Sequence, residues 1–328
     1  MQSSHQNQDS LRSRSQNLLP RPLLSPFVAK TLEVEGDSGF PFGAAHYNQR
    51  HNLIIACPLD RTIQFYDATS LLPIKGRKAL KVDRSVVQMS FHPETDTYLL
   101  GCTAGSMYKY NASRNQLKKL KVYGKQVAGI TFLDSNFYFF TLLDSKKLYV
   151  GTLDDDNVFK VDRGHPSAFG LHHINKRNLL FSGLTNGDVR VYRTSKLPLL
   201  QAICSAHTGE WVSGIHSLNI NGKEYVVTSS KNQPVKIWHL TKGRMRLLKV
   251  IHTEGVCPSS IYFEQEKMIV IGDQSNEIKF LRFPSMRLEK AVRVSHLGVH
   301  HLFSMKEKGL IGVRCGTGNR VEFIQLYP

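Results

Sequence analysis

One short pattern returns along the chain at a nearly constant interval, and it constrains the fold more than any other feature. Two apolar residues flank a variable one, and an aromatic or apolar residue usually follows in the fourth position. That position falls at Tyr66, Tyr110, Gly151, Tyr192, Trp238, Leu281 and Ile324. The intervals are 44, 41, 41, 46, 43 and 43 residues. Such regular self-similarity indicates copies of one structural unit.

Each copy has the pattern of short β-strands joined by tight turns. Apolar runs of strand length alternate with gaps that hold Gly, Asn, Asp or Ser. In the clearest gap, Asn186-Gly187 favours the positive φ angles of a hairpin turn. A histidine also lies upstream of four copies, at intervals of 42, 45 and 44 residues. These histidines are His165, His207, His252 and His296.

The segment 225–239, preceded by Ala206-His207-Thr208, resembles a WD40 repeat, and so does the segment 54–67. The resemblance covers about residues 27–328 and implies an all-β, seven-bladed β-propeller with four antiparallel strands in each blade. It also implies a buried hydrogen-bonded network that includes His207 and Trp238. Asn232 stands where the family has an acid in that network, and Asp60 and Ser275 occupy equivalent turns.

Residues 30–34 have the same alternating form as the predicted outer strands, although they precede the first copy. The seventh copy is followed by too few residues for an outer strand of its own. We therefore expect residues 27–35 to complete the last blade and close the ring. Residues 1–26 are polar and aperiodic, which predicts a flexible tail outside a propeller of residues 27–328.

The chain is basic, with 43 Lys and Arg against 26 Asp and Glu, and part of this excess lies on predicted outer strands. The candidate basic rim comprises Lys78, Lys81, Lys118, Lys119, Lys121, Arg246 and Lys249. Such a rim could contact RNA, DNA or an acidic protein. Lysines on edge strands also prevent edge-to-edge aggregation, and this alternative explains the same residues.

No apolar run approaches the length of a membrane span, and no secretory signal is evident, so we expect an intracellular protein of the cytoplasm or nucleus. Arg12, Arg14 and Arg21 give weak support for mitochondrial targeting. The five cysteines are too scattered for a disulfide framework, and we expect reduced thiols.

No nucleophile elbow, P-loop or zinc-protease motif is present. His172-His173 and His300-His301 are adjacent pairs, and neighbours in a strand point to opposite faces, so we expect neither pair to chelate a metal. Asp154 to Asp156 could hold calcium, but a solvated loop explains them better. We therefore expect no enzyme activity, cofactor or metal.

The loops before the first strand and between the second and third strands open on one face of such a ring. We predict a partner-binding face there, formed by Arg84, Lys125, Glu210, Trp211 and Glu254. Trp211 is the best candidate for direct contact with a partner, because tryptophan is enriched in interface hot spots. It could also pack against its own blade. The favoured function is a non-catalytic scaffold for protein–protein interactions in a multi-subunit assembly. The alternative is a nucleic-acid or ribonucleoprotein-associated propeller that uses the basic rim.

Overall fold

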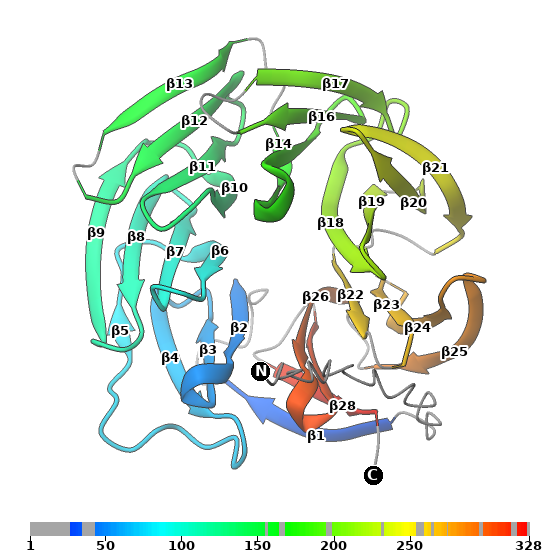
Figure 1. Ribbon diagram of the computed structural model, residues 1–328. Coiled ribbons are helices and arrows are strands. Elements are labelled where there is room, and N and C mark those ends of the chain that lie inside the picture. Colours follow the sequence, from blue (N-terminus) through cyan, green and yellow to red (C-terminus); the bar gives the residue numbers. More distant parts are fainter. Residues whose placement is uncertain are drawn as a thin grey trace, which may run out of the picture.

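The described part of the protein is a ring of seven antiparallel sheets, each of four strands, arranged around a central axis (Figure 1). The computed structural model describes residues 27–34, 43–154, 157–163, 168–194, 199–230, 233–253, 259–263, 266–273, 275–294, 298–315 and 320–326. The predicted all-β seven-bladed propeller is confirmed. The predicted tail, residues 1–26, lies outside the described residues.

We number the blades in chain order, with the strands of each blade given from the channel outward. Blade one contains β2 (Ala44–Asn48), β3 (Leu53–Cys57), β4 (Thr62–Asp67) and β5 (Leu80–Lys81). Blade two contains β6 (Val86–His92), β7 (Thr97–Cys102), β8 (Ser106–Asn111) and β9 (Gln116–Val122). Blade three contains β10 (Val127–Phe132), β11 (Phe137–Leu142), β12 (Lys147–Thr152) and β13 (Val158–Arg163). Blade four contains β14 (Ala168–Ile174), β15 (Leu179–Leu184), β16 (Asp188–Arg193) and β17 (Leu199–Ser205).

Blade five contains β18 (Val212–Ile220), β19 (Lys223–Ser230), β20 (Gln233–Thr241) and β21 (Arg244–Ile251). Blade six contains β22 (Ser259–Phe263), β23 (Met268–Gly272), β24 (Glu277–Arg282) and β25 (Arg287–Arg293). Blade seven contains β26 (Val299–Met305), β27 (Leu310–Cys315), β28 (Arg320–Gln325) and β1 (Phe27–Glu33). Three single-turn helices, η1 (Gln49–His51), η2 (Asn175–Arg177) and η3 (Lys306–Lys308), connect the first and second strands of blades one, four and seven.

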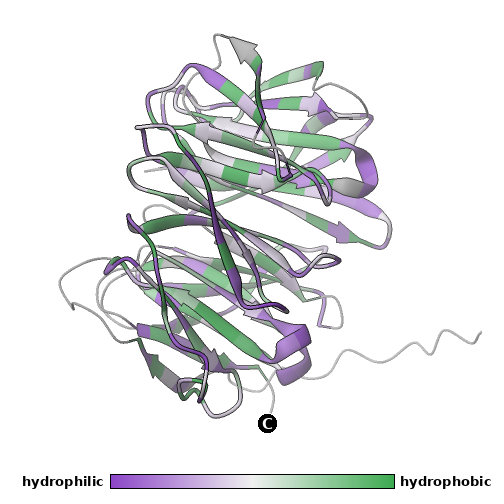
Figure 2. Cartoon of the chain, turned by 90° about the vertical axis from the view of Figure 1, so that its left-hand side faces the viewer, coloured by the Kyte–Doolittle hydropathy of each residue, from purple (hydrophilic) through white to green (hydrophobic). Residues whose placement is uncertain are grey.

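The recurring sequence pattern forms the third strand of every blade, from β4 to β28. The second strands are buried along their length, as in β3, because neighbouring blades cover both faces of each sheet. The core therefore lies between blades: one cluster joins Ile55 of blade one to Leu100 of blade two. Along the outer strands, hydrophilic residues alternate with hydrophobic ones, as the side view shows (Figure 2).

The ring closes as the sequence predicts, because β1 pairs antiparallel with β28 (Figure 1). Leu32 lies opposite Val321 and is only 3% exposed, within a cluster that joins blades seven and one. Next to it, Glu33 Oε1 lies 2.9 Å from Arg320 Nη2 in an exposed ion pair. Strands from opposite ends of the chain thus share one sheet.

Two local expectations need correction. In the turn between β15 and β16, Gly187 has a φ of +89°, whereas Asn186 does not have a positive φ. Instead, the Asn186 Oδ1 atom accepts a hydrogen bond from the backbone N–H of Asp188 at 3.2 Å. The sequence pattern places Lys78 and Lys81 on an outer strand, but β5 includes only Leu80 and Lys81, so Lys78 lies ahead of the strand.

Candidate interaction surface and central channel

Three side chains form the network that the repeat resemblance implies in blade five. The Thr228 Oγ1 atom lies 2.9 Å from His207 Nε2 and accepts a hydrogen bond from Trp238 Nε1 at 2.8 Å. His207 and Thr228 are fully buried, and Trp238 is nearly so. Burial, aided by the charge of Lys236, lowers the pKa of His207 to about 4. The ring is therefore neutral at pH 7, while Asn232 lies outside the described residues.

The network anchors the loop that leads into β18. The His207 N–H donates to the Gly187 carbonyl of blade four at 2.8 Å, and Gln233 Nε2 donates to the Thr208 carbonyl at 2.9 Å. The Glu210 N–H donates to the His207 carbonyl at 3.3 Å. The loop is thus fastened to both adjacent blades immediately before Trp211.

Trp211 is 52% exposed at the end of this loop, although the residue also interacts with another part of the molecule. Arg84 and Lys125 are exposed and Glu210 is partly buried, in loops that precede first strands. Lys125 Nζ donates to the Asp144 carbonyl at 3.0 Å, which ties it to the β11–β12 loop of the next blade. Glu254 lies outside the described residues.

The seven side chains of the candidate basic rim are all exposed. Lys119, however, lies 2.6 Å from Asp83 in an ion pair. Partial burial raises the pKa of Asp83, but hydrogen bonds from Lys119, Tyr108 and Ser106 outweigh it and bring the pKa to about 2. Asp83 therefore neutralises part of the charge that the sequence places on blade two.

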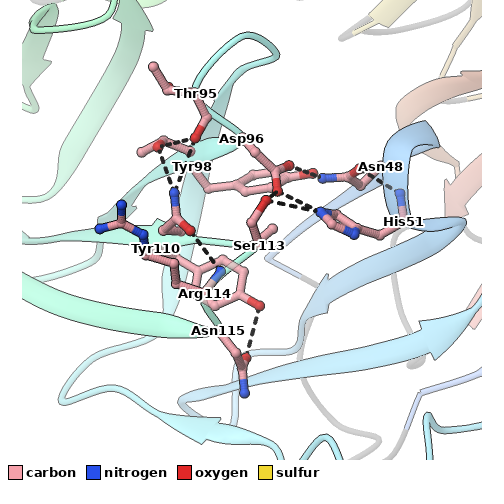
Figure 3. A network of polar contacts seen from close by, with 12 residues as sticks. Asn48, His51, Thr95, Asp96, Tyr98, Tyr110, Ser113, Arg114 and Asn115 are labelled. Atoms are coloured by element: carbon pink, nitrogen blue, oxygen red, sulfur yellow. Dashed lines mark hydrogen bonds and ion pairs between the residues drawn. The ribbon is translucent and has the colours of Figure 1, made fainter.

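A second polar network connects blades one and two (Figure 3). Asp96 is 1% exposed; its Oδ1 accepts from Asn48 Nδ2 at 2.8 Å, and its Oδ2 lies 2.6 Å from His51 Nε2. Ser113 Oγ donates to the same carboxylate and lies 3.4 Å from the same His51 nitrogen.

Asp96, His51 and Ser113 have the composition of a hydrolase triad but not its geometry. In a triad the acid and the serine contact different nitrogens of the imidazole, so that the ring can relay a proton between them. Here both approach Nε2 of His51. The network instead fastens the β2–β3 connection of blade one to two turns of blade two.

The first strands line a central channel of about 570 Å³, which the sequence did not lead us to expect. His46, His172, His216 and His301 lie along it, together with Arg314 of β27. The recurrence of histidine in first strands is the sequence signal that could have revealed it. His172 Nε2 lies 2.6 Å from Ser217 Oγ and His173 Nε2 lies 3.0 Å from Thr194 Oγ1, so the adjacent rings have separate partners.

No group of three or more His, Cys, Asp or Glu suited to a metal ion occurs within the described ranges. Asp155 and Asp156, and the His300 side chain, fall outside them. Among the helices that the structure describes, none is long and apolar enough to span a membrane. Cys57, Cys102, Cys204 and Cys315 are free thiols.

No protein-family model matches the chain. Among curated proteins, it is similar to the WD repeat-containing protein 55 homologs of Drosophila simulans and Drosophila melanogaster, each 22% identical over 137 residues. This alignment covers 40% of this chain and 28% of each relative. The homolog of Drosophila persimilis is 23% identical over 124 residues, or 37% of this chain and 25% of the relative.

The alignments thus span little more than a quarter of the length of these relatives. Their names agree with the seven-bladed ring and with the His207–Thr228–Trp238 network. The chain is a seven-bladed β-propeller that is similar to WD repeat-containing proteins. A propeller fold does not itself set the function, which depends on its loops, faces and channel lining.

Proposed function

We propose that this WD40 propeller is a non-catalytic scaffold that binds partner proteins through the face carrying Trp211, within a multi-subunit assembly. Arg84, Lys125, Glu210 and Glu254 belong to the same proposed face. We further propose an intracellular location and a tail, residues 1–26, outside the propeller. The observation that carries the proposal is an exposed tryptophan on a loop that is fixed before binding.

The fixed loop matters because ordering a flexible segment on binding consumes part of the interaction energy. Hydrogen bonds to Gly187, Gln233 and His207 already hold residues 206–211 between blades four and five. A large aromatic ring presented on such a rigid base buries much apolar surface with little loss of entropy. These are the properties of an interface anchor.

The test compares Trp211→Ala with Leu288→Ala, which truncates an exposed apolar side chain on β25; the two residues are 52% and 49% exposed. Partners captured by the full chain from cells are quantified by mass spectrometry, and the dissociation constant of the most enriched partner is then measured. We expect Trp211→Ala to weaken binding about 30-fold, as for a hot spot of about 2 kcal/mol, and Leu288→Ala to leave it unchanged. Unchanged capture by Trp211→Ala, or equal loss in both variants, would contradict the proposal.

The nucleic-acid alternative receives no added support from the rim, where Asp83 pairs with Lys119. It predicts salt-dependent binding to RNA or DNA that is lost when Lys118, Lys119 and Lys121 are replaced by Glu. Tight binding of that kind, with no effect of Trp211→Ala, would replace the scaffold proposal with this one.

A further inference from the structure

The central channel is lined by basic and imidazole side chains. Its described lining residues include six histidines and one arginine but no Asp or Glu. These are His46, His92, His172, His173, His216, His301 and Arg314. They come from blades one, two, four, five and seven, so the combination exists only in the closed ring.

Arg314 supplies a permanent charge to this channel. Its Nη1 donates to the Gly43 carbonyl oxygen, at the junction of blades seven and one. Burial lowers the pKa of Arg314 to about 10, so the guanidinium is still charged at pH 7. A buried cation is costly unless negative charge or dipoles compensate it, and a bound anion would relieve that cost.

The histidines around Arg314 provide uncharged donors. His46 Nδ1 lies 3.1 Å from the Tyr98 hydroxyl, and the Nδ1 atom of His301 is buried without a hydrogen-bond partner. Burial lowers the pKa of His46 to about 4 and that of His301 to about 3, and Arg314 adds to the effect on His301. Each neutral ring keeps one N–H, which can be donated to an anion.

We propose that the central channel binds a small phosphate-bearing anion, with Arg314 as the fixed charge and His46, His216 and His301 as hydrogen-bond donors. A volume of about 570 Å³ is typical of small-molecule sites and exceeds the needs of one phosphate ion. A phosphate offers more acceptor oxygens than a carboxylate to donors that converge from several blades. Pyrophosphate should therefore bind more tightly than inorganic phosphate.

Anion binding in the channel should also take up protons. A bound anion stabilises the charged imidazolium form, so it raises the pKa of the nearby histidines. The titratable and charged groups facing these rings are the other channel histidines, Arg314 and Tyr98, together with Lys306 and Tyr262 in the adjoining cavity that His172 and His216 also line. Sulfate does not change its charge between pH 5.5 and pH 8, so its affinity reports this effect directly. We expect it to bind several-fold more tightly at pH 5.5.

The test measures thermal unfolding of the full chain with increasing pyrophosphate at constant ionic strength, set with sodium chloride. We expect a saturable rise in Tm and at least a tenfold loss of affinity in Arg314→Gln. The matched control is Arg246→Gln, which removes one positive charge from the rim and should leave the affinity unchanged. Absence of a saturable rise, an equal rise in Arg314→Gln, or its loss in Arg246→Gln would overturn the proposal.

A second measurement guards against misfolding of Arg314→Gln. Broadening of the pyrophosphate ³¹P resonance by the wild-type chain should weaken in His216→Gln and His301→Gln, and unchanged broadening in both would overturn the assignment. The affinities of ribose 5-phosphate and inorganic phosphate are then compared, because a phosphate group could come from an ester or from the free ion. Tighter binding of the sugar phosphate assigns the site to phosphate esters, and tighter binding of the inorganic ion assigns it to free phosphate.

Discussion

The Thr228 hydroxyl joins two buried nitrogens, His207 Nε2 at 2.9 Å and Trp238 Nε1 at 2.8 Å. Thr228→Val keeps the shape of the side chain but leaves both nitrogens without this partner. We expect the free energy of unfolding to fall by about 2–3 kcal/mol, because two buried nitrogens lose a hydrogen-bond partner. Thr228→Ser keeps the hydroxyl and should cost only about 1 kcal/mol for the lost methyl group. Urea denaturation of the two variants checks this, and a loss in Thr228→Val no larger than that in Thr228→Ser would contradict the role of the hydroxyl as a hydrogen-bond partner.

Among single residues, some roles were predictable from the sequence. His207 and Trp238 match a repeat whose network is local to one blade, and the structure contains it. Arg314 was not predictable in the same way. It lies on a second strand, and only the curvature of the ring brings its guanidinium to the channel and to Gly43 of another blade.

Among the strands, β1 contributes most to the closed ring. Leu32→Ala should lower the free energy of unfolding by about 2–5 kcal/mol, since it removes a side chain that is 3% exposed between blades seven and one. Thr31→Ala, at an exposed position of the same strand, should change it by less than about 0.5 kcal/mol. Chemical denaturation measures both. A chain that starts at residue 40 and keeps its full Tm would contradict closure by β1.

The strands and their closure were predictable because alternating hydrophobicity is a local signal. The length of β5 was not, because tertiary contacts determine the preceding loop. Arg77 from that loop lies over the Phe65 ring at 4.8 Å and donates to the Tyr110 hydroxyl and the Ala112 carbonyl of blade two, both at 2.6 Å. The chain ahead of β5 is therefore fastened by side chains rather than by a longer strand.

Across the whole molecule, buried histidines make stability depend on pH. Burial lowers the pKa of His46 and His207 to about 4, and that of His172 and His301 to about 3. In the unfolded chain these rings titrate near about pH 6.5 and bind protons that the folded state does not. The contribution of these neutral rings to the free energy of unfolding is therefore fully present above about pH 6.5 and is lost as the pH falls toward about 4.

Each ring should contribute up to about 1.4 kcal/mol per pH unit in this window. Urea denaturation at pH 7, 6 and 5 measures the loss. His172→Gln should make the dependence shallower, whereas His252→Gln, at an exposed position, should not. A stability that stays constant from pH 7 to pH 5 would contradict the neutral, buried state of these rings.

The sheet that joins β1 to β28 has a consequence for synthesis. A ribosome adds roughly 5–20 residues per second, so on the order of tens of seconds separate translation of β1 from that of its partner strand. During this interval Leu32 has no blade to cover it, and blade one has no neighbour on its β1 side. The nascent chain therefore exposes an open strand edge until β28 leaves the exit tunnel.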